Sequence, residues 1–252
     1  MSVRPEPVDV AGRLAAVHRR VAEAARRSDR TPASVTVVAV SKGFAPEVVA
    51  AARAAGQVDF GENRVQEMTA KAGVLDGVRW HFIGRLQRNK VRDVVDTASL
   101  VHSVDRIELA EVLADRAGRA GRLQRILVQV NAGDDPAKGG CRIDDAPGLV
   151  AAVRQMDALA CEGLMTMPPA GVDPRPVFAR LRQLRDDLRQ DFPQVQHLSM
   201  GMTHDFEVAV EEGATIVRVG EGIFGPRPDP NLRPSSGQSS DQQSPVVPAG
   251  RI

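Results

Sequence analysis

The sequence predicts an α/β fold, a single-domain (β/α)8 TIM barrel. Three observations support this class. The chain has 252 residues, close to the roughly 250 that such a barrel usually takes. Eight short apolar runs alternate with segments of helical periodicity. The runs are almost continuously apolar, which is typical of parallel strands covered on both faces. A doubly wound open sheet is the alternative, and the count of eight favours the barrel.

The predicted elements follow one another along the chain. An amphipathic helix over residues 10–27 precedes the first strand and has Val10, Leu14, Val17 and Val21 on one face. Strands are expected at 36–42, 58–63, 79–84, 99–105, 125–131, 161–167, 196–202 and 215–220. Helices are expected between them at 46–56, 63–73, 86–96, 106–121, 146–159, 173–190 and 204–213.

Three regions are expected. Residues 1–8 form a loose N-terminus, residues 9–227 form the barrel with its additional N-terminal helix, and residues 228–252 form a disordered tail. The tail is rich in Pro, Ser, Gln and Gly and has no periodic apolar face, so it cannot build a core. We therefore expect no second domain after the barrel.

The composition argues against several classes of function. A formal net charge of +1 and an aromatic content of 3% predict no nucleic-acid partner. No apolar run approaches the ~18 residues of a membrane span, and the N-terminus lacks the apolar core of a signal peptide. Cys141 and Cys161 suit reduced thiols. We expect a cytoplasmic protein without a membrane partner, either a monomer or a weak dimer.

The first candidate functional residue is the lysine that ends the first predicted strand. Lysine is rare here, since the 33 basic residues include only Lys42, Lys71, Lys90 and Lys138. Active sites of (β/α)8 barrels collect at the carboxyl ends of the strands, where Lys42 would lie. A lysine amine can lose its proton and act as a nucleophile, which arginine cannot do. A surface lysine or an ion pair is the alternative.

The loops after the seventh and eighth strands have the composition of a phosphate site. Ser199, Gly201 and Thr203 end the seventh strand and Gly220 ends the eighth. Hydroxyls and backbone N–H groups at these strand ends often bind phosphate in this fold, although tight turns alone are the alternative. Strands one and eight are neighbours in a closed barrel. Pyridoxal 5′-phosphate (PLP) carries an aldehyde for Lys42 and a phosphate for these loops, so it matches both features.

Arg218 interrupts the apolar eighth strand and is the third candidate. A buried arginine needs an acceptor, which a structural salt bridge would supply. The functional interpretation is that Arg218 faces the pyridine nitrogen of PLP. Because arginine stays protonated, that nitrogen would stay unprotonated, which weakens the ring as an electron sink.

Eight motifs in order resemble one family. They are AVSK, FGEN-x-VQE, WHFIG-x-LQ-x-NK, HSVD, VN…K-x-G, GLM-x-M, LSMGM-x-x-D-x-E and VR-x-G-x-x-IFG, from about residue 35 to residue 227. Together they resemble the PLP homeostasis protein family (YggS/PROSC, PLPBP). The resemblance implies a fold-type III PLP barrel like the N-terminal domain of alanine racemase. It also implies a vitamin B6 regulator or carrier rather than a catalyst, with apo PLP-dependent enzymes as candidate recipients.

The resemblance also implies roles for individual residues. Lys42 would carry PLP as a Schiff base, Asn63 would lie near the ring, and Arg218 would meet the pyridine nitrogen. The phosphate would be held by Ser199, Gly201, Thr203 and Gly220. Two positions depart from the family pattern, since Gly43 follows the lysine where Thr is common, and Glu221 stands where a small residue or a hydroxyl is usual. We expect Glu221 to offer only its backbone N–H and to point away from the phosphate.

Two alternative functions remain open. A fold-type III racemase would need a second acid or base, and the chain has no tyrosine. His81 or His102 could stand in, although a histidine on an apolar strand is more often a core residue. A class I aldolase-like barrel would use Lys42 directly on a carbonyl substrate and would be colourless, whereas a PLP protein is yellow.

Overall fold

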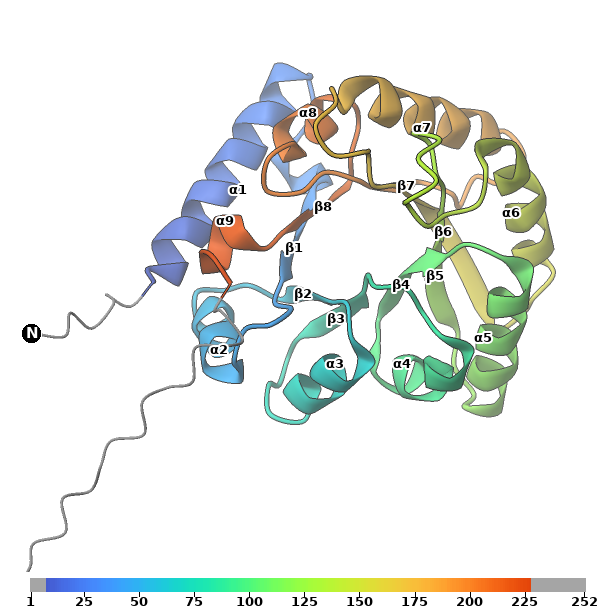
Figure 1. The fold of residues 1–252 in the computed structure, drawn as a ribbon, viewed down its shortest axis with the longest axis horizontal. Helices are drawn as coiled ribbons and strands as arrows, with labels where there is room; N and C mark the ends of the chain where they lie inside the picture. The colour runs from blue at the N-terminus through green and yellow to red at the C-terminus, as the bar shows by residue number, and fades with distance from the viewer. Residues whose placement is uncertain (1–7, 228–252) are drawn as a thin grey trace, which may run out of the picture.

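The computed structural model describes residues 8–227, which form a closed parallel barrel surrounded by helices (Figure 1). In this range eight strands follow in sequential order, and β1 pairs with β8 to close the sheet. The predicted (β/α)8 class is confirmed, and the open sheet is wrong. The strands are β1 Thr36–Val40, β2 Asp59–Glu62, β3 Arg79–Phe82, β4 Leu100–Val104, β5 Gln124–Gln129, β6 Leu159–Met165, β7 His197–Ser199 and β8 Ile216–Val219.

Helices cover the outside of the sheet. They are α1 Val10–Arg27, α2 Pro46–Ala54, α3 Val65–Ala72, α4 Val91–Thr97, α5 Ile107–Arg119, α6 Ala146–Arg154, α7 Arg175–Leu188, α8 Phe206–Glu211 and α9 Glu221–Phe224. No helix within residues 8–227 has the length and hydropathy needed to cross a membrane. The expectations for residues 1–7 and 228–252 lie outside the described residues.

Most element boundaries differ from the sequence prediction by a few residues, and the helix expected over 86–96 begins only at Val91. The end of α6 and the start of β6 show why. The helix expected over 146–159 ends at Arg154, and β6 begins at Leu159 rather than at Cys161. Leu159 pairs with Gln124 of β5, so strand pairing takes up a residue that helical periodicity alone had assigned to the helix. The short helix α9 was not predicted, because four residues are too few to show a period.

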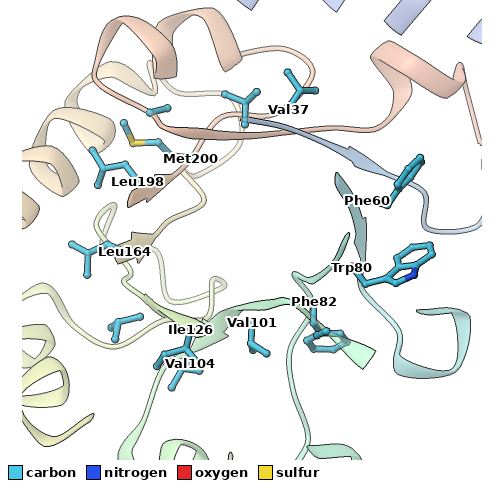
Figure 2. Close-up of a cluster of buried hydrophobic side chains, with 14 of the residues drawn as sticks. Val37, Phe60, Trp80, Phe82, Val101, Val104, Ile126, Leu164, Leu198 and Met200 are labelled. Atoms are coloured by element: carbon cyan, nitrogen blue, oxygen red, sulfur yellow. The ribbon is translucent and has the colours of Figure 1, made fainter. Parts of the chain in front are cut away.

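The main core lies between the strands and the helices. Figure 2 shows side chains of this layer on the strands, among them Phe60, Trp80, Ile126, Leu164 and Leu198. Each of these five is at most 4% exposed. Burial of this layer from both sides explains why the strand sequences are apolar along most of their length.

The barrel interior is filled by the alternate side chains of the strands. A small apolar cluster holds Val38, Leu100, Leu127, Met165 and Ile216. Space is tight, because a Cβ atom at Gly61 of β2 would lie 2.9 Å from Val38. The interior is therefore a packed core rather than a channel, as is usual for this fold.

The N-terminal helix α1 follows its prediction residue for residue, from Val10 to Arg27. The side chain of Asp9 caps it by accepting a hydrogen bond from the Gly12 N–H at 2.8 Å. The helix packs against α8 and α9, which flank the last strand (Figure 1). Val17 lies 3.6 Å from the position that a Cβ atom of Gly222 would occupy, so α1 supports the loop after β8 closely.

Candidate functional site

A cavity of about 220 Å³ opens at the carboxyl ends of the strands. Five of the seven predicted site residues line it, and they come from the ends of four strands: Lys42, Asn63, Thr203, Arg218 and Gly220. The remaining wall residues are Val40, Phe44, Ile83, Met167, Met202, His204, Glu221 and Arg227. The cavity thus combines apolar side chains with polar and charged groups that converge on it, as small-molecule sites do.

Lys42 reaches the cavity because of the alternation of strand β1. Val38 and Val40 belong to the inward-facing set, and Lys42 follows two residues later. Among the described residues no hydrogen bond or ion pair involves the Lys42 amine. Burial lowers the pKa of this amine, and the charge of Arg227 lowers it further against the opposing charges of nearby glutamates. A larger neutral fraction makes the amine a better nucleophile.

The neighbouring Ser41 fixes the strand end from the outer side. Its hydroxyl donates to Glu62 Oε1 at 2.7 Å, and its carbonyl accepts from Lys71 Nζ at 2.7 Å. Lys71 also pairs with Glu62 at 2.5 Å, and both side chains are at most 5% exposed. Burial raises the pKa of Glu62, while the hydrogen bonds from Lys71 and Ser41 act in the opposite direction. This buried group anchors the backbone that presents Lys42.

Gly43 follows the lysine with a φ of 77°, a left-handed conformation that glycine adopts without strain. Its N–H donates to Glu67 Oε2 at 2.8 Å. The turn after β1 is therefore held by α3, and the backbone conformation accounts for glycine at this position.

Arg218 enters the cavity wall from inside the barrel and is 4% exposed. Its Nη1 donates to Ser199 Oγ at 2.6 Å and its Nη2 donates to the Thr166 carbonyl at 3.0 Å. Burial lowers the pKa of Arg218 to about 10, so it stays protonated at neutral pH. A guanidinium has five N–H donors, and those outside these two bonds remain for a ligand. No carboxylate bonds to Arg218 in the described residues, so the salt-bridge alternative is not supported.

The loops after β7 and β8 meet beside Lys42. The Gly222 N–H lies 3.4 Å from Thr203 Oγ1, which joins the two loops. Thr203 and Gly220 both line the cavity. The Thr203 hydroxyl and the Gly220 backbone are therefore available at the cavity wall.

Two predicted phosphate ligands lie behind this wall. Ser199 is fully buried, and its hydroxyl bonds to Arg218 and to His102 Nδ1 at 2.8 Å. Gly201 has a φ of 89° and packs against α8, where a Cβ atom would lie 2.5 Å from Ala209. In this structure the first residue supports Arg218 and the second shapes the turn. Their part in phosphate binding stays a prediction.

Several wall residues were not predicted from the sequence, and Arg227 matters most among them. Arg227 Nη2 lies 3.3 Å from Glu221 Oε1 at the rim. Glu221 is itself a wall residue, so its carboxylate sits near the cavity and is paired with an arginine. Only the strand-end positions of Ile83, Met167 and Met202 gave a usable signal. Arg227 lies seven residues after Gly220, and no pattern marked it.

Asn63, a wall residue, has a buried acceptor without a partner. The Oδ1 atom of Asn63 is buried and makes no hydrogen bond within the described residues. A buried acceptor of this kind is costly to leave unpaired. By contrast, no three His, Cys, Asp or Glu side chains in residues 8–227 are placed to hold a metal ion.

Comparison with known proteins agrees with this geometry. Residues 13–228 match the family described as "Alanine racemase, N-terminal domain". The chain is 41% identical to the pyridoxal phosphate homeostasis protein of Aquifex aeolicus over 221 residues, covering 85% of this chain and 97% of that protein. The protein of the same name from Escherichia coli K12 is 37% identical, covering 87% and 97%. The chain belongs to the pyridoxal phosphate homeostasis protein family.

A solved member of this family has the same fold. PipY of Synechococcus elongatus PCC7942, determined with PLP bound, superposes with a TM-score of 0.75 at 37% identity. The match covers 86% of this chain and all of PipY. The expected family assignment is confirmed, and so is the likeness to the alanine racemase N-terminal domain.

Proposed function

We propose that this member of the pyridoxal phosphate homeostasis protein family binds PLP as a Schiff base on Lys42 and regulates or carries it rather than catalysing a reaction. The Lys42 amine carries this proposal, because it has no partner in the described residues and lies in one cavity with Arg218. Asn63 and Thr203 add polar side chains to the wall of the same cavity, which suits a ligand with polar groups. The PLP-bound relative PipY supports the identity of that ligand.

The residues of the chain fit this cofactor. PLP, when bound, supplies an aldehyde that a neutral primary amine can attack. Lys42 provides that amine, with its pKa lowered by burial and by Arg227. Arg218 offers N–H donors to the ring nitrogen and stays protonated. Thr203 and Gly220 offer a hydroxyl and backbone N–H groups to the phosphate.

The interior histidines favour a carrier over a racemase. His81 and His102 were the bases that the sequence offered, and neither lines the cavity. Both are bonded to other side chains inside the barrel. A racemase would have to use His204 or Glu221, which do line the cavity. Alanine racemization measured on the PLP-loaded protein separates the two functions, and turnover that disappears in His204→Asn would support the racemase.

Borohydride reduction followed by peptide mapping tests the lysine. The four lysines give internal controls, because Lys71 is buried in an ion pair, while Lys90 and Lys138 lie outside the cavity. We expect the pyridoxyl label on Lys42 and none in Lys42→Arg. A label on Lys71, Lys90 or Lys138 instead would contradict the proposal. A colourless protein that takes up no label would favour the aldolase-like alternative.

The carrier role has its own test. The PLP-loaded protein is mixed with an apo PLP-dependent enzyme in the presence of excess phosphatase, which destroys free PLP. Recovery of the apo-enzyme faster than free PLP allows would support direct transfer. Recovery that phosphatase abolishes would show that the protein only releases PLP into solution.

A further inference from the structure

A line of five hydrogen-bonded side chains crosses the barrel interior below the cavity. Asp59 Oδ1 lies 3.1 Å from His81 Nε2, and His81 Nδ1 lies 2.9 Å from His102 Nε2. His102 Nδ1 lies 2.8 Å from Ser199 Oγ, which Arg218 Nη1 reaches at 2.6 Å. The side chains come from β2, β3, β4, β7 and β8, and each residue is at most 8% exposed. We call this line the relay.

The relay has a charged end at the opposite mouth of the barrel. Burial alone would raise the pKa of Asp59, but hydrogen bonds from His81 and Arg79 outweigh burial and lower that pKa to about 2. Arg79 pairs with Asp59 at 2.7 Å, and its side chain is 58% exposed. Asp59 is therefore an anion near solvent, and it can only accept hydrogen bonds.

The anion fixes the direction of every bond in the relay. His81 must donate from Nε2 to Asp59, so a neutral His81 accepts at Nδ1. His102 then donates from Nε2 and accepts at Nδ1, so the Ser199 hydroxyl donates to it. The Ser199 oxygen is left to accept from Arg218. Full burial, with the charge of Arg218 adding to it, holds the pKa of His102 well below its usual value, which keeps this ring neutral.

One added proton at His81 reverses this direction. A protonated His81 donates from both nitrogens, so His102 must accept at Nε2 and donate from Nδ1. Ser199 Oγ then receives two N–H donors, from His102 and Arg218, and its own hydrogen loses its acceptor. A buried hydroxyl without an acceptor is destabilising. The same atoms and distances thus support two states, and the Ser199 hydroxyl that accepts from Arg218 is fully hydrogen-bonded in only one of them.

Charged and titratable groups face the relay from several strands. The carboxylates among them favour proton uptake at His81, whereas the arginines and His197 oppose it. The groups are Asp59 on β2, Arg79 on β3, Arg125 on β5, Glu162 on β6, His197 on β7 and Arg218 on β8. Arg125 and Glu162 pair with each other at 2.6 Å, so Asp59 is the carboxylate that bonds directly to the histidines.

We propose that Asp59, His81, His102 and Ser199 act as positioning residues that hold Arg218 against the ring nitrogen of the bound cofactor, and that a proton taken up at His81 reverses the relay and loosens that hold. The inference rests on the proposed binding of PLP in the cavity. It makes retention of the cofactor sensitive to pH through groups at the far end of the barrel, which touch neither the cofactor nor Lys42.

Cofactor retention tests the relay in the PLP-loaded protein. The dissociation constant and the absorption of bound PLP are measured from pH 5 to pH 9 in the wild type and in variants. His102→Leu removes the acceptor of Ser199, and we expect about tenfold weaker binding at pH 8 with an altered absorption band. Asp59→Asn removes the carboxylate that favours protonation of His81, so the acidic limb of the profile should move to lower pH.

His197→Asn is the matched control, because His197 is a neighbouring interior histidine that bonds to Thr215 instead of the relay. It should leave the affinity at pH 8 unchanged and move the acidic limb by less than Asp59→Asn does, because His197 makes no hydrogen bond to the relay. Wild-type profiles in both His102→Leu and Asp59→Asn would overturn the relay. A shift in His197→Asn as large as in Asp59→Asn would also overturn it, because any interior charge change would then suffice.

A second measurement needs no cofactor. In apo protein labelled with ¹⁵N-histidine, we expect both His81 and His102 as the Nε2–H tautomer at neutral pH, with assignment by His81→Asn and His102→Asn. An Nδ1–H tautomer at either position would overturn the relay. If the wild type binds no PLP, the proposed function fails, and this tautomer measurement still decides whether the relay has the stated direction.

Discussion

Lys42 and Lys71 both lie near the end of β1, but their side chains have opposite environments. Lys71 is buried and paired with Glu62 at 2.5 Å, so its charge is neutralised in place. Lys42 lies beside Arg227 in the cavity, and burial together with that positive charge lowers the pKa of its amine. The difference follows from alternation along β1, which sends Ser41 outward to the ion pair and Lys42 inward to the cavity.

A single substitution should change the titration of Lys42. In Arg227→Gln the positive charge near the amine is lost, so the pKa of Lys42 should rise. The neutral amine then forms only at higher pH, and the pH midpoint for the rate of PLP incorporation should move upward. Stopped-flow absorbance measures this rate. Arg189→Gln, an exposed arginine after α7, controls for net charge and should leave the midpoint unchanged. An unchanged or lower midpoint in Arg227→Gln would contradict the role of Arg227.

At the scale of elements, the turn from β7 to α8 depends on one glycine. Gly201 has a φ of 89°, and an added Cβ atom would lie 2.5 Å from Ala209 and 2.9 Å from the Phe206 Cα atom. Gly201→Ala should destabilise the fold by about 2–3 kcal/mol, measured by urea unfolding. Thr203 would move with this turn, so PLP affinity should fall as well.

Gly148→Ala is the matched control for Gly201→Ala. Gly148 lies within α6, where an added Cβ atom meets nothing within 4 Å. Alanine is a better helix former, so this variant should gain about 0.5–1 kcal/mol and keep its PLP affinity. If both variants lose stability equally, the steric account of Gly201 is wrong.

The elements themselves could be predicted because barrel strands have a simple pattern. Runs such as TVVAV and RILVQ are apolar for the same reason in each case, since both faces are covered. Strand ends then placed Lys42, Thr203, Arg218 and Gly220 in one region, and the structure brings them together. Ser199 shows the limit of this reasoning. Its strand-end position was visible, but not that its side chain faces Arg218 and His102 inside the barrel.

The relay could not be predicted from the sequence for a related reason. Asp59, His81 and His102 lie on three different strands, and on each strand a buried polar residue suggests only a satisfied core position. Their connection depends on strand register and on side-chain rotamers across the barrel, such as the pairing of Gly61 with His81. No local pattern encodes these features.

At the scale of the whole molecule, the N-terminal helix α1 contributes both to the stability of the fold and to the support of the cavity. Val17 of α1 is 2% exposed and packs near Gly222, next to the cavity residues Gly220 and Glu221. Val17→Ala should cost about 2 kcal/mol of unfolding free energy and weaken PLP binding severalfold, because α9 and its loop lose their support. Val153→Ala of α6 makes the same chemical change at a fully buried site away from the cavity. It should cost similar stability, measured by urea unfolding, yet leave the PLP dissociation constant as in the wild type. Equal loss of affinity in both variants would mean that global stability, rather than the contact of α1 with α9, governs retention of the cofactor.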